Sequence, residues 1–329
     1  MVKMDASLNL KIEQIKAEIK NIVKDDILYV AFSGGMDSTI AAFLAREALG
    51  PEKVKLVNVL FGPFAYSKSV ESVLKTAEDL GLEIEFADKH QAQYSIMKKG
   101  PNCNQCTKTL KMSGVKEVAK DKLVATGANQ SDSWGKTCIK VMNNLYSPII
   151  GLTKEELREI VKRYNLKIRK VGENAHREGC KLKHLLKLLI NMDYHGRAVS
   201  FANEIIHDVL DRYDYKREIA NVKIIGPLSK NIALINIKPH PPKEIYDEII
   251  EILENEKSID EVYIVDKPIE LTISANPGIY GNEESRYWIE KGRLQPEFAA
   301  PLKVVWKKSK NERLATFHAV DFRFLDEEW

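Results

Sequence analysis

One short stretch limits the fold more than any other part of the sequence. Residues Ser33–Ser38 read Ser-Gly-Gly-Met-Asp-Ser, follow the apolar run Ile27–Phe32, and lead into a helical pattern over residues 37–49. A buried strand that turns sharply into a helix is typical of α/β proteins with a parallel sheet. Glycines let the backbone approach an anion closely, and a helix N-terminus offers unpaired N–H groups to phosphate. The stretch therefore predicts a phosphate-binding loop.

The same six residues exclude two other phosphate loops. The patterns G-x-x-x-x-G-K-[ST] and G-x-G-x-x-G are both absent at this turn. Ser33 and Ser38 add hydroxyl donors, while Asp37 is placed to hold Mg²⁺ or to cap the helix. A plain glycine turn with an aspartate cap is the alternative, and the strand–loop–helix context favours the phosphate loop over it.

Strand and helix patterns alternate through the first half of the chain. After the loop, the sequence predicts strands at Val54–Leu60, Leu82–Phe86 and Leu123–Thr126, and helices over residues 67–80, 107–120 and 153–164. This alternation predicts an α/β fold, a Rossmann-like parallel sheet with helices on both faces. An amphipathic helix over residues 6–23 precedes the first strand, because apolar side chains recur there at helical spacing.

The second half follows a different pattern. It predicts two helices over residues 181–213, a hairpin of 222–225 with 232–237, a helix over 241–255 and a strand at 262–265. We therefore expect a smaller α+β domain after the parallel sheet. The predicted division is an N-terminal helix at residues 1–25, the domain with the glycine loop at 26–190, and the α+β domain at 191–329.

Composition limits the cellular compartments in which such a chain is expected. Of the 329 residues, 44% are hydrophobic, which suffices for a core without disulfides. No apolar run approaches the about 20 residues that span a bilayer, and the Lys- and Glu-rich N-terminal pattern is not that of a signal peptide. Four cysteines are too few for a secreted disulfide scaffold. We expect a cytoplasmic protein with no membrane partner.

The glycine loop resembles the S-G-G-x-D-S fingerprint of the PP-loop ATP pyrophosphatases. The resemblance covers about residues 26–180, and it implies that the chain binds ATP with Mg²⁺ and adenylates a carbonyl oxygen of its substrate. It assigns ATP contacts to Ser33, Gly34, Gly35, Asp37 and Ser38. It also gives Asp37 a catalytic role. Residues 147–150 and 154–156 look like the strand-to-helix turn of the same family, a weaker match.

A later segment also resembles this family. Residues 127–132 match its G-x-N-x-D-D element at Gly127, Asn129 and Asp132, while Ser131 replaces the first aspartate. The resemblance implies nucleotide contacts from Gly127 and Asn129 and a catalytic carboxylate at Asp132.

Three of the four cysteines have a spacing that suggests a shared site. Cys103 and Cys106 form a C-x-x-C pair, and Cys180 lies after the helix predicted over residues 153–164. The residues leave three alternatives open: buried thiols without a ligand, a structural zinc site and an iron–sulfur cluster. Cys138 is a fourth ligand, a persulfide carrier or a bystander.

Within the PP-loop enzymes, this order of cysteines resembles the sulfur-inserting enzymes that thiolate tRNA. The resemblance implies that Cys103, Cys106 and Cys180 hold a 4Fe-4S cluster with one iron open, and zinc is the alternative metal. It gives Cys106 and Cys180 a catalytic role, because a persulfide on either one is the alternative sulfur source. Sulfide or a sulfur donor is then a partner of the protein.

Lysines near these cysteines favour a polyanionic partner. Residues 98–122 contain seven lysines against one glutamate and one aspartate, a local charge of +5. Such a patch suits a phosphate backbone, although a solvated lysine face is the alternative. We expect tRNA as the partner macromolecule and leave a homodimer open.

Together these patterns predict an ATP-dependent sulfurtransferase that adenylates a carbonyl oxygen, most plausibly of a tRNA pyrimidine, and replaces it with sulfur. The first alternative is a PP-loop synthetase that uses ammonia as its nucleophile. The second is a sulfur donor in cofactor biosynthesis. A nucleotide-binding regulator without catalysis is the third, and the complete phosphate loop disfavours it.

Overall fold

The computed structural model describes residues 2–131, 135–137, 139–169 and 180–325. Contacts between Cα atoms divide the chain into two compact units. Unit 1 comprises Met1–Leu60, Lys68–Lys89 and Lys108–Lys170, and unit 2 comprises Phe61–Ser67, His90–Thr107 and Val171–Trp329. Among the described residues, no helix combines the length and the apolar character needed to cross a membrane.

Unit 1 is built on a six-stranded sheet in the order β3-β2-β1-β4-β6-β5. Its strands are β1 (Leu28–Ala31), β2 (Val54–Leu60), β3 (Glu83–Asp88), β4 (Val124–Ala125), β5 (Val141–Met142) and β6 (Leu145–Tyr146). All neighbours pair in parallel except β5, which runs antiparallel to β6 at the edge. The predicted Rossmann-like α/β fold is confirmed. Strands β2 and β3 lie on one side of β1, and β4, β6 and β5 lie on the other, so the strand order reverses at β1. Open α/β sheets bind ligands at such a reversal.

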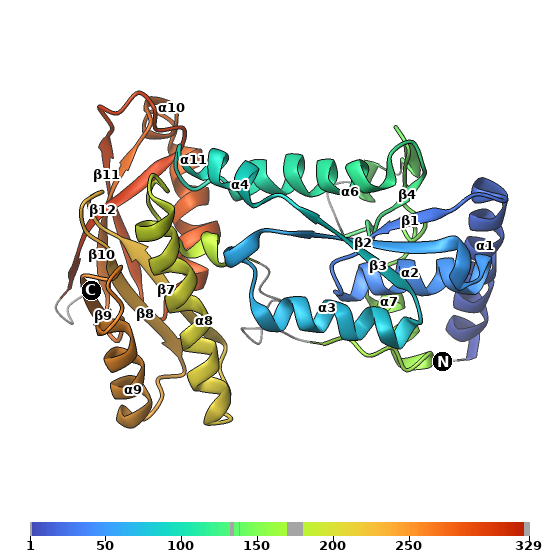
Figure 1. Ribbon diagram of the computed structural model, residues 1–329, viewed down its shortest axis with the longest axis horizontal. Helices are drawn as coiled ribbons and strands as arrows, with labels where there is room; N and C mark the ends of the chain where they lie inside the picture. The colour runs from blue at the N-terminus through green and yellow to red at the C-terminus, as the bar shows by residue number, and fades with distance from the viewer. Residues whose placement is uncertain (1, 132–134, 138, 170–179, 326–329) are drawn as a thin grey trace. The chain divides into compact units, whose positions relative to one another are not determined.

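Helices cover both faces of this sheet (Figure 1). They are α1 (Val2–Val23), α2 (Met36–Leu49), α3 (Ser67–Leu80), α6 (Met112–Ala119) and α7 (Lys154–Arg163). Alternate residues of β1 point to opposite faces, as in any strand: Leu28 and Val30 join the core under α1, α2, α3 and α7, whereas Tyr29 packs toward α6. Burial on both faces explains why this strand is apolar throughout.

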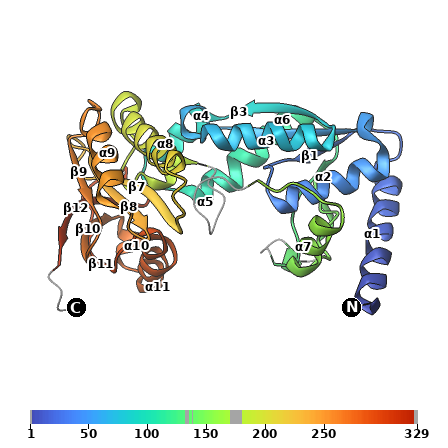
Figure 2. The same ribbon diagram turned by 90° about the horizontal axis from the view of Figure 1, so that it is seen from below.

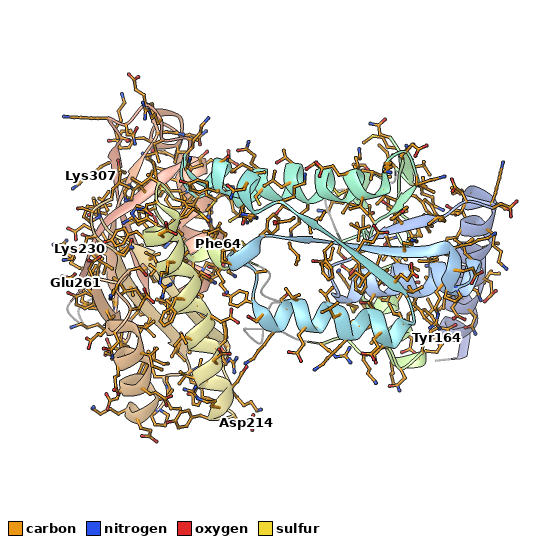
Figure 3. The ribbon with its side chains drawn as sticks, in the orientation of Figure 1. Phe64, Tyr164, Asp214, Lys230, Glu261 and Lys307 are labelled. Atoms are coloured by element: carbon orange, nitrogen blue, oxygen red, sulfur yellow. The ribbon has the colours of Figure 1, made fainter. Side chains whose placement is uncertain are left out.

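The predicted N-terminal helix is confirmed in α1, which packs against α2 as Figure 2 shows. Its buried side chains are Leu8, Ile12, Ile15, Ile19 and Val23. Helix α7 also packs against α2: it ends at Tyr164, labelled in Figure 3, whose ring lies 4.7 Å from that of Phe43. Helix α2 therefore contacts both α1 and α7, and an ion pair between Lys11 and Glu156 joins those two helices to each other.

Unit 2 contains two three-stranded sheets, in the orders β7-β8-β9 and β11-β10-β12. Their strands are β7 (Ile219–Ile225), β8 (Ile232–Lys238), β9 (Glu261–Ile264), β10 (Ile269–Ala275), β11 (Leu302–Lys308) and β12 (Phe317–Phe324). The helices are α4 (His90–Met97), α5 (Cys103–Gln105), α8 (Arg197–Arg212), α9 (Lys243–Glu254), α10 (Pro277–Tyr280) and α11 (Glu283–Tyr287). The predicted hairpin is confirmed, because β7 and β8 pair antiparallel. An ion pair between Lys230 and Glu261, both labelled in Figure 3, joins the start of β8 to β9.

One predicted helix is wrong. Only the second of the two helices expected over residues 181–213 forms, as α8, while residues 181–184 make a single 3-10 turn and residues 185–190 are neither helix nor strand. Leu185 forms a parallel bridge with Ile224, and the Leu186 N–H donates to the Ile224 carbonyl at 3.0 Å. Buried Lys187 donates to the Pro227 carbonyl at 2.6 Å. These tertiary hydrogen bonds override the local helical preference of a Leu- and Lys-rich segment.

Candidate functional site

The loop between β1 and α2 is braced by its own serines. The Ser33 N–H donates to Ser38 Oγ at 3.2 Å, and Ser38 Oγ donates to the Gly35 carbonyl at 3.1 Å. The two hydroxyl oxygens lie 3.1 Å apart. Gly34 has a φ of 68°, in the left-handed region that favours glycine. The sequence therefore folds this loop into one compact turn directly before the helix.

Among the described residues, no side chain caps the first turn of α2. Gly35 is the N-cap residue and makes no side-chain hydrogen bond to the first turn. Ser33 is exposed beside it. Because the N–H groups of a first turn have no partner inside the helix and carry its positive dipole end, this arrangement suits a phosphate group.

Asp37 lies in the first turn of α2 and is held on one side only. Its Oδ2 accepts hydrogen bonds from Asn129 Nδ2 at 3.1 Å and from Lys154 Nζ at 2.7 Å. Its Oδ1 is buried and has no hydrogen-bond partner among the described residues. A buried carboxylate oxygen without a partner requires an explanation, and carboxylates are the usual protein ligands of Mg²⁺. The residues present therefore fit ATP bound with magnesium.

The segment after β4 packs tightly against this turn. A Cβ added at Gly127 would lie 2.9 Å from the backbone nitrogen of Ser38 and 3.0 Å from the carbonyl carbon of Asp37. Asn129 is fully buried, and its Oδ1 accepts from the Ser131 N–H at 3.1 Å. The structure thus brings Gly127 and Asn129, for which the resemblance implied nucleotide contacts, close to the loop. Asp132 lies outside the described residues.

Lys154 is a site residue that the sequence analysis did not select. Its segment matched the family weakly, and that match was the available signal. Thr153 caps α7 by accepting from the Glu156 N–H at 3.2 Å, while Glu156 Oε2 accepts from the Thr153 N–H at 2.9 Å. Lys11 adds an ion pair to Glu156 at 2.6 Å. This reciprocal cap fixes the first turn of α7 and with it the lysine that reaches Asp37.

A second group of candidate residues lies in unit 2, where distant segments bring thiols together. Gln93 Nε2, on α4, donates to Cys180 Sγ at 3.2 Å and to Cys106 Sγ at 3.6 Å. Cys103 Sγ accepts from Arg293 Nη2 at 3.6 Å. Neither Gln93 nor Arg293 had any signal in the sequence, because no motif or spacing connects them to the cysteines. Cys138 lies outside the described residues.

This geometry gives no support to the predicted iron–sulfur cluster or zinc site. Within the described ranges, no group of three or more His, Cys, Asp or Glu side chains could hold a metal ion. Gln93 instead places an amide within hydrogen-bonding distance of both Cys106 and Cys180, and the cysteines Cys103, Cys106 and Cys180 form no disulfide. Burial raises the pKa of the Cys180 thiol to about 12, so this thiol is neutral at pH 7 rather than an activated thiolate.

Comparisons with known proteins concern mainly the first part of the chain. A family model described as NAD synthase matches residues 8–133. The chain is 39% identical over 90 residues to a glutamine-hydrolysing GMP synthase of Malacoplasma penetrans, covering 27% of this chain and 17% of that protein. It is 27% identical over 216 residues to an NH3-dependent NAD⁺ synthetase of Pyrococcus horikoshii, covering 61% and 78%.

Among solved structures, the chain is similar to an NH3-dependent NAD synthetase from Campylobacter jejuni in complex with the nitrate ion, at 21% identity and a TM-score of 0.41. That alignment covers 48% of this chain and 74% of the other. The sequence matches support the predicted PP-loop superfamily and an enzyme of that superfamily. They do not confirm its tRNA-thiolating group, and the sulfurtransferase hypothesis gains no support from them.

Proposed function

We propose that unit 1 binds ATP with Mg²⁺, uses it to adenylate an oxygen atom of a second substrate, and lets ammonia displace the activated oxygen. This is the synthetase alternative of the sequence analysis. The observation that carries it is Asp37, whose Oδ2 is held by Lys154 and Asn129 while its buried Oδ1 has no partner among the described residues. The similarity to an NH3-dependent NAD⁺ synthetase favours ammonia as the nucleophile.

Each residue of the loop has a separate task in this proposal. Gly35 and the first turn of α2 bind phosphate through backbone N–H groups, and the two serine hydroxyls add donors. Asp37 holds the magnesium ion, and Lys154 and Asn129 keep its carboxylate in one orientation. Gly127 lets the segment after β4 approach the helix closely enough for Asn129 to reach Asp37. Bound ATP supplies the adenylyl group that makes a poor leaving oxygen a good one.

Sulfur transfer is the second candidate, and the thiols of unit 2 favour it. Cys106 and Cys180 share the Gln93 amide although they lie far apart in the sequence. An ammonia-dependent synthetase gives these thiols no task. In this version the outer sulfur of a persulfide on Cys106 or Cys180, loaded by a persulfide donor, attacks the activated carbon of tRNA or of a small molecule of cofactor assembly, and AMP leaves with the oxygen. The other of the two thiols then attacks the carrier cysteine, which releases the thiolated product and leaves a Cys106–Cys180 disulfide that an external thiol must reduce.

Isotope incorporation distinguishes the two nucleophiles. The protein is incubated with MgATP, a filtered small-molecule cell extract and bulk tRNA, together with ¹⁵N-ammonium, a low-molecular-weight persulfide labelled with ³⁴S at its outer sulfur, and a thiol reductant. AMP, pyrophosphate and new labelled products are then measured by mass spectrometry. We expect AMP and pyrophosphate in equal amounts and ¹⁵N in the product. Incorporation of ³⁴S with no ¹⁵N would overturn the ammonia proposal in favour of sulfur transfer.

Replacing Cys106 and Cys180 together by serine provides the matching control. If ammonia is the nucleophile, the double variant forms AMP and the ¹⁵N product at the rate of the parent protein. A loss of product with intact ATP binding would assign the thiols to the reaction.

A further inference from the structure

Unit 2 contains a cavity of about 880 Å³ that no step of the proposed function uses. Its walls come from several separate segments, among them the loop around Cys103, the π-helical turn Trp288–Leu294, and Thr316 and Phe317 where β12 begins. Ligand sites for small molecules have volumes of about 300–1,000 Å³ and combine apolar walls with a few polar groups. The cavity therefore has the size of a small-molecule site.

One wall is aromatic and faces outward. Trp288 is 62% exposed, far more than a core tryptophan, and it lines the cavity together with Ile279 and Phe317. Gly292 leaves room for the indole, because a Cβ at this position would lie 3.1 Å from Trp288 Cε3. A large exposed aromatic ring at the edge of a cavity is a platform on which a planar group can stack.

Arg293 supplies a cation in the same cavity. Its guanidinium lies 5.3 Å from the ring centre of Phe317 and donates weak hydrogen bonds to the Pro101 carbonyl at 3.4 Å and to Cys103 Sγ at 3.6 Å. Among the described residues no carboxylate pairs with it. A guanidinium has five N–H donors in a planar fork that matches a carboxylate or phosphate. Most of this donor capacity is available to a ligand.

The charged groups of the lining balance in number, with Lys183 and Arg293 against Glu297 and Glu218. Glu297 pairs with Lys183 at 3.1 Å and with buried Lys223, which lies outside the lining. Glu218 is exposed. Among the described residues Arg293 is therefore the lining cation that no carboxylate pairs, and a ligand group that lies beside it is favoured if it carries negative charge.

We propose that this cavity binds a small planar organic anion, with its ring stacked on Trp288 and its carboxylate, sulfonate or phosphate group on Arg293. Cys103 lines the same cavity and contacts Arg293, so the bound anion lies beside this thiol. The proposal is independent of ATP chemistry in unit 1, and either one can fail without the other.

Two probes that differ only in charge test the proposal by fluorescence titration of the full chain. The anionic probe is 8-anilino-1-naphthalenesulfonate, and the neutral one is N-phenyl-1-naphthylamine. We expect Arg293→Gln to weaken binding of the anionic probe about tenfold and to leave the neutral probe within twofold, because the variant loses the charge-assisted hydrogen bonds that only the sulfonate accepts. Trp288→Ala should weaken both probes, because it removes the stacking surface.

Lys291→Gln is the matched control, since Lys291 is an exposed cation of the same helical turn that does not line the cavity. It should change neither titration. Thermal unfolding checks the fold of each variant, and Arg293→Lys, which keeps the charge but not the fork, replaces Arg293→Gln if the latter unfolds. Saturating anionic probe should also slow alkylation of Cys103 by iodoacetamide. Equal affinities of the parent, Arg293 and Lys291 variants for the anionic probe would overturn the proposal.

Discussion

In unit 1 the side chains around Asp37 come from the ends of neighbouring parallel strands, whereas in unit 2 the thiols and Arg293 come from helices and loops scattered along the chain. The first arrangement is rigid because each segment that contributes to it is anchored. The loop after β1, the segment after β4 and the turn before α7 are each anchored by a strand or a capped helix. The second arrangement depends on individual tertiary contacts, such as the Gln93 amide that joins Cys106 to Cys180.

This difference has a consequence for charge. Asp37 in unit 1 keeps an oxygen without a partner in the described part of the chain, while Glu297 in unit 2 is surrounded by Lys223, Lys183 and His184. A carboxylate left incompletely paired is suited to a ligand, and one that is fully paired is suited to holding segments together. We therefore infer that Asp37 binds a ligand and that Glu297 holds segments of unit 2 together.

The largest expected effect concerns Glu297 and acid. Burial opposes ionisation, but Lys223 and Lys183 outweigh it and lower the pKa of Glu297 from 4.5 to about 2. A carboxyl group whose pKa is lowered by folding stabilises the protein above its unfolded pKa, and this contribution disappears as the pH falls from 4.5 to 2. The loss amounts to about 3 kcal/mol for the whole shift.

Chemical denaturation between pH 6 and pH 2 measures this loss. In Glu297→Gln the slope of stability against pH should flatten over that range, while the exposed Glu312→Gln should behave like the parent. If Glu297→Gln keeps the full acid dependence of the parent, Glu297 does not have the structural role assigned here.

The next effect concerns Gly127 in unit 1. In Gly127→Ala the new methyl group meets the backbone of Ser38 and Asp37 at 2.9–3.1 Å, so the first turn of α2 must shift. We expect a loss of stability of about 2 kcal/mol, in the range of overpacked sites, together with weaker ATP binding. Gly151→Ala is the control, because no atom lies within 4 Å of the added carbon. Equal unfolding midpoints for the two variants would show that the close approach is not needed.

A smaller effect is expected from Lys154. Lys154→Met removes the 2.7 Å ion pair that orients Asp37 and leaves the fold of α7 to its Thr153 cap. We expect affinity for MgATP to fall roughly tenfold, equivalent to about 1.4 kcal/mol. Lys162→Met, an exposed lysine on the same helix, should bind MgATP like the parent protein. Isothermal titration calorimetry measures both, and a wild-type affinity in Lys154→Met would remove this lysine from the site.

The sequence predicted the fold of unit 1 well, because the loop and the strands of this unit leave signals in short stretches of sequence. The Ser33–Ser38 loop and Gly127 and Asn129 belong to short motifs after strands, and the strands of a parallel sheet end at one edge. Lys154 was missed as a site residue because its motif is weak outside the fold. In unit 2 residues 185–190 were predicted as part of a helix. The bridge between Leu185 and Ile224 depends on a distant strand, and the local sequence therefore carries no signal of it.

The spacing of the cysteines along the sequence does not predict which side chains surround them. The C-x-x-C pair with a late cysteine predicted a metal centre, and the structure does bring Cys106 and Cys180 to one amide. Spacing alone does not reveal that Gln93 would lie between them. The same holds for Arg293, whose contact with Cys103 joins residues 190 positions apart.

Magnesium-dependent ATP binding by Asp37→Asn tests the central claim most directly, because this variant keeps the shape of the side chain and removes only its charge. Calorimetric titration with ATP is carried out with and without Mg²⁺ on the parent, on Asp37→Asn and on Asp25→Asn, whose carboxylate is fully exposed in unit 1. The account predicts that magnesium strengthens ATP binding at least tenfold in the parent and in Asp25→Asn, and does not strengthen it in Asp37→Asn. An unchanged magnesium effect in Asp37→Asn would contradict it.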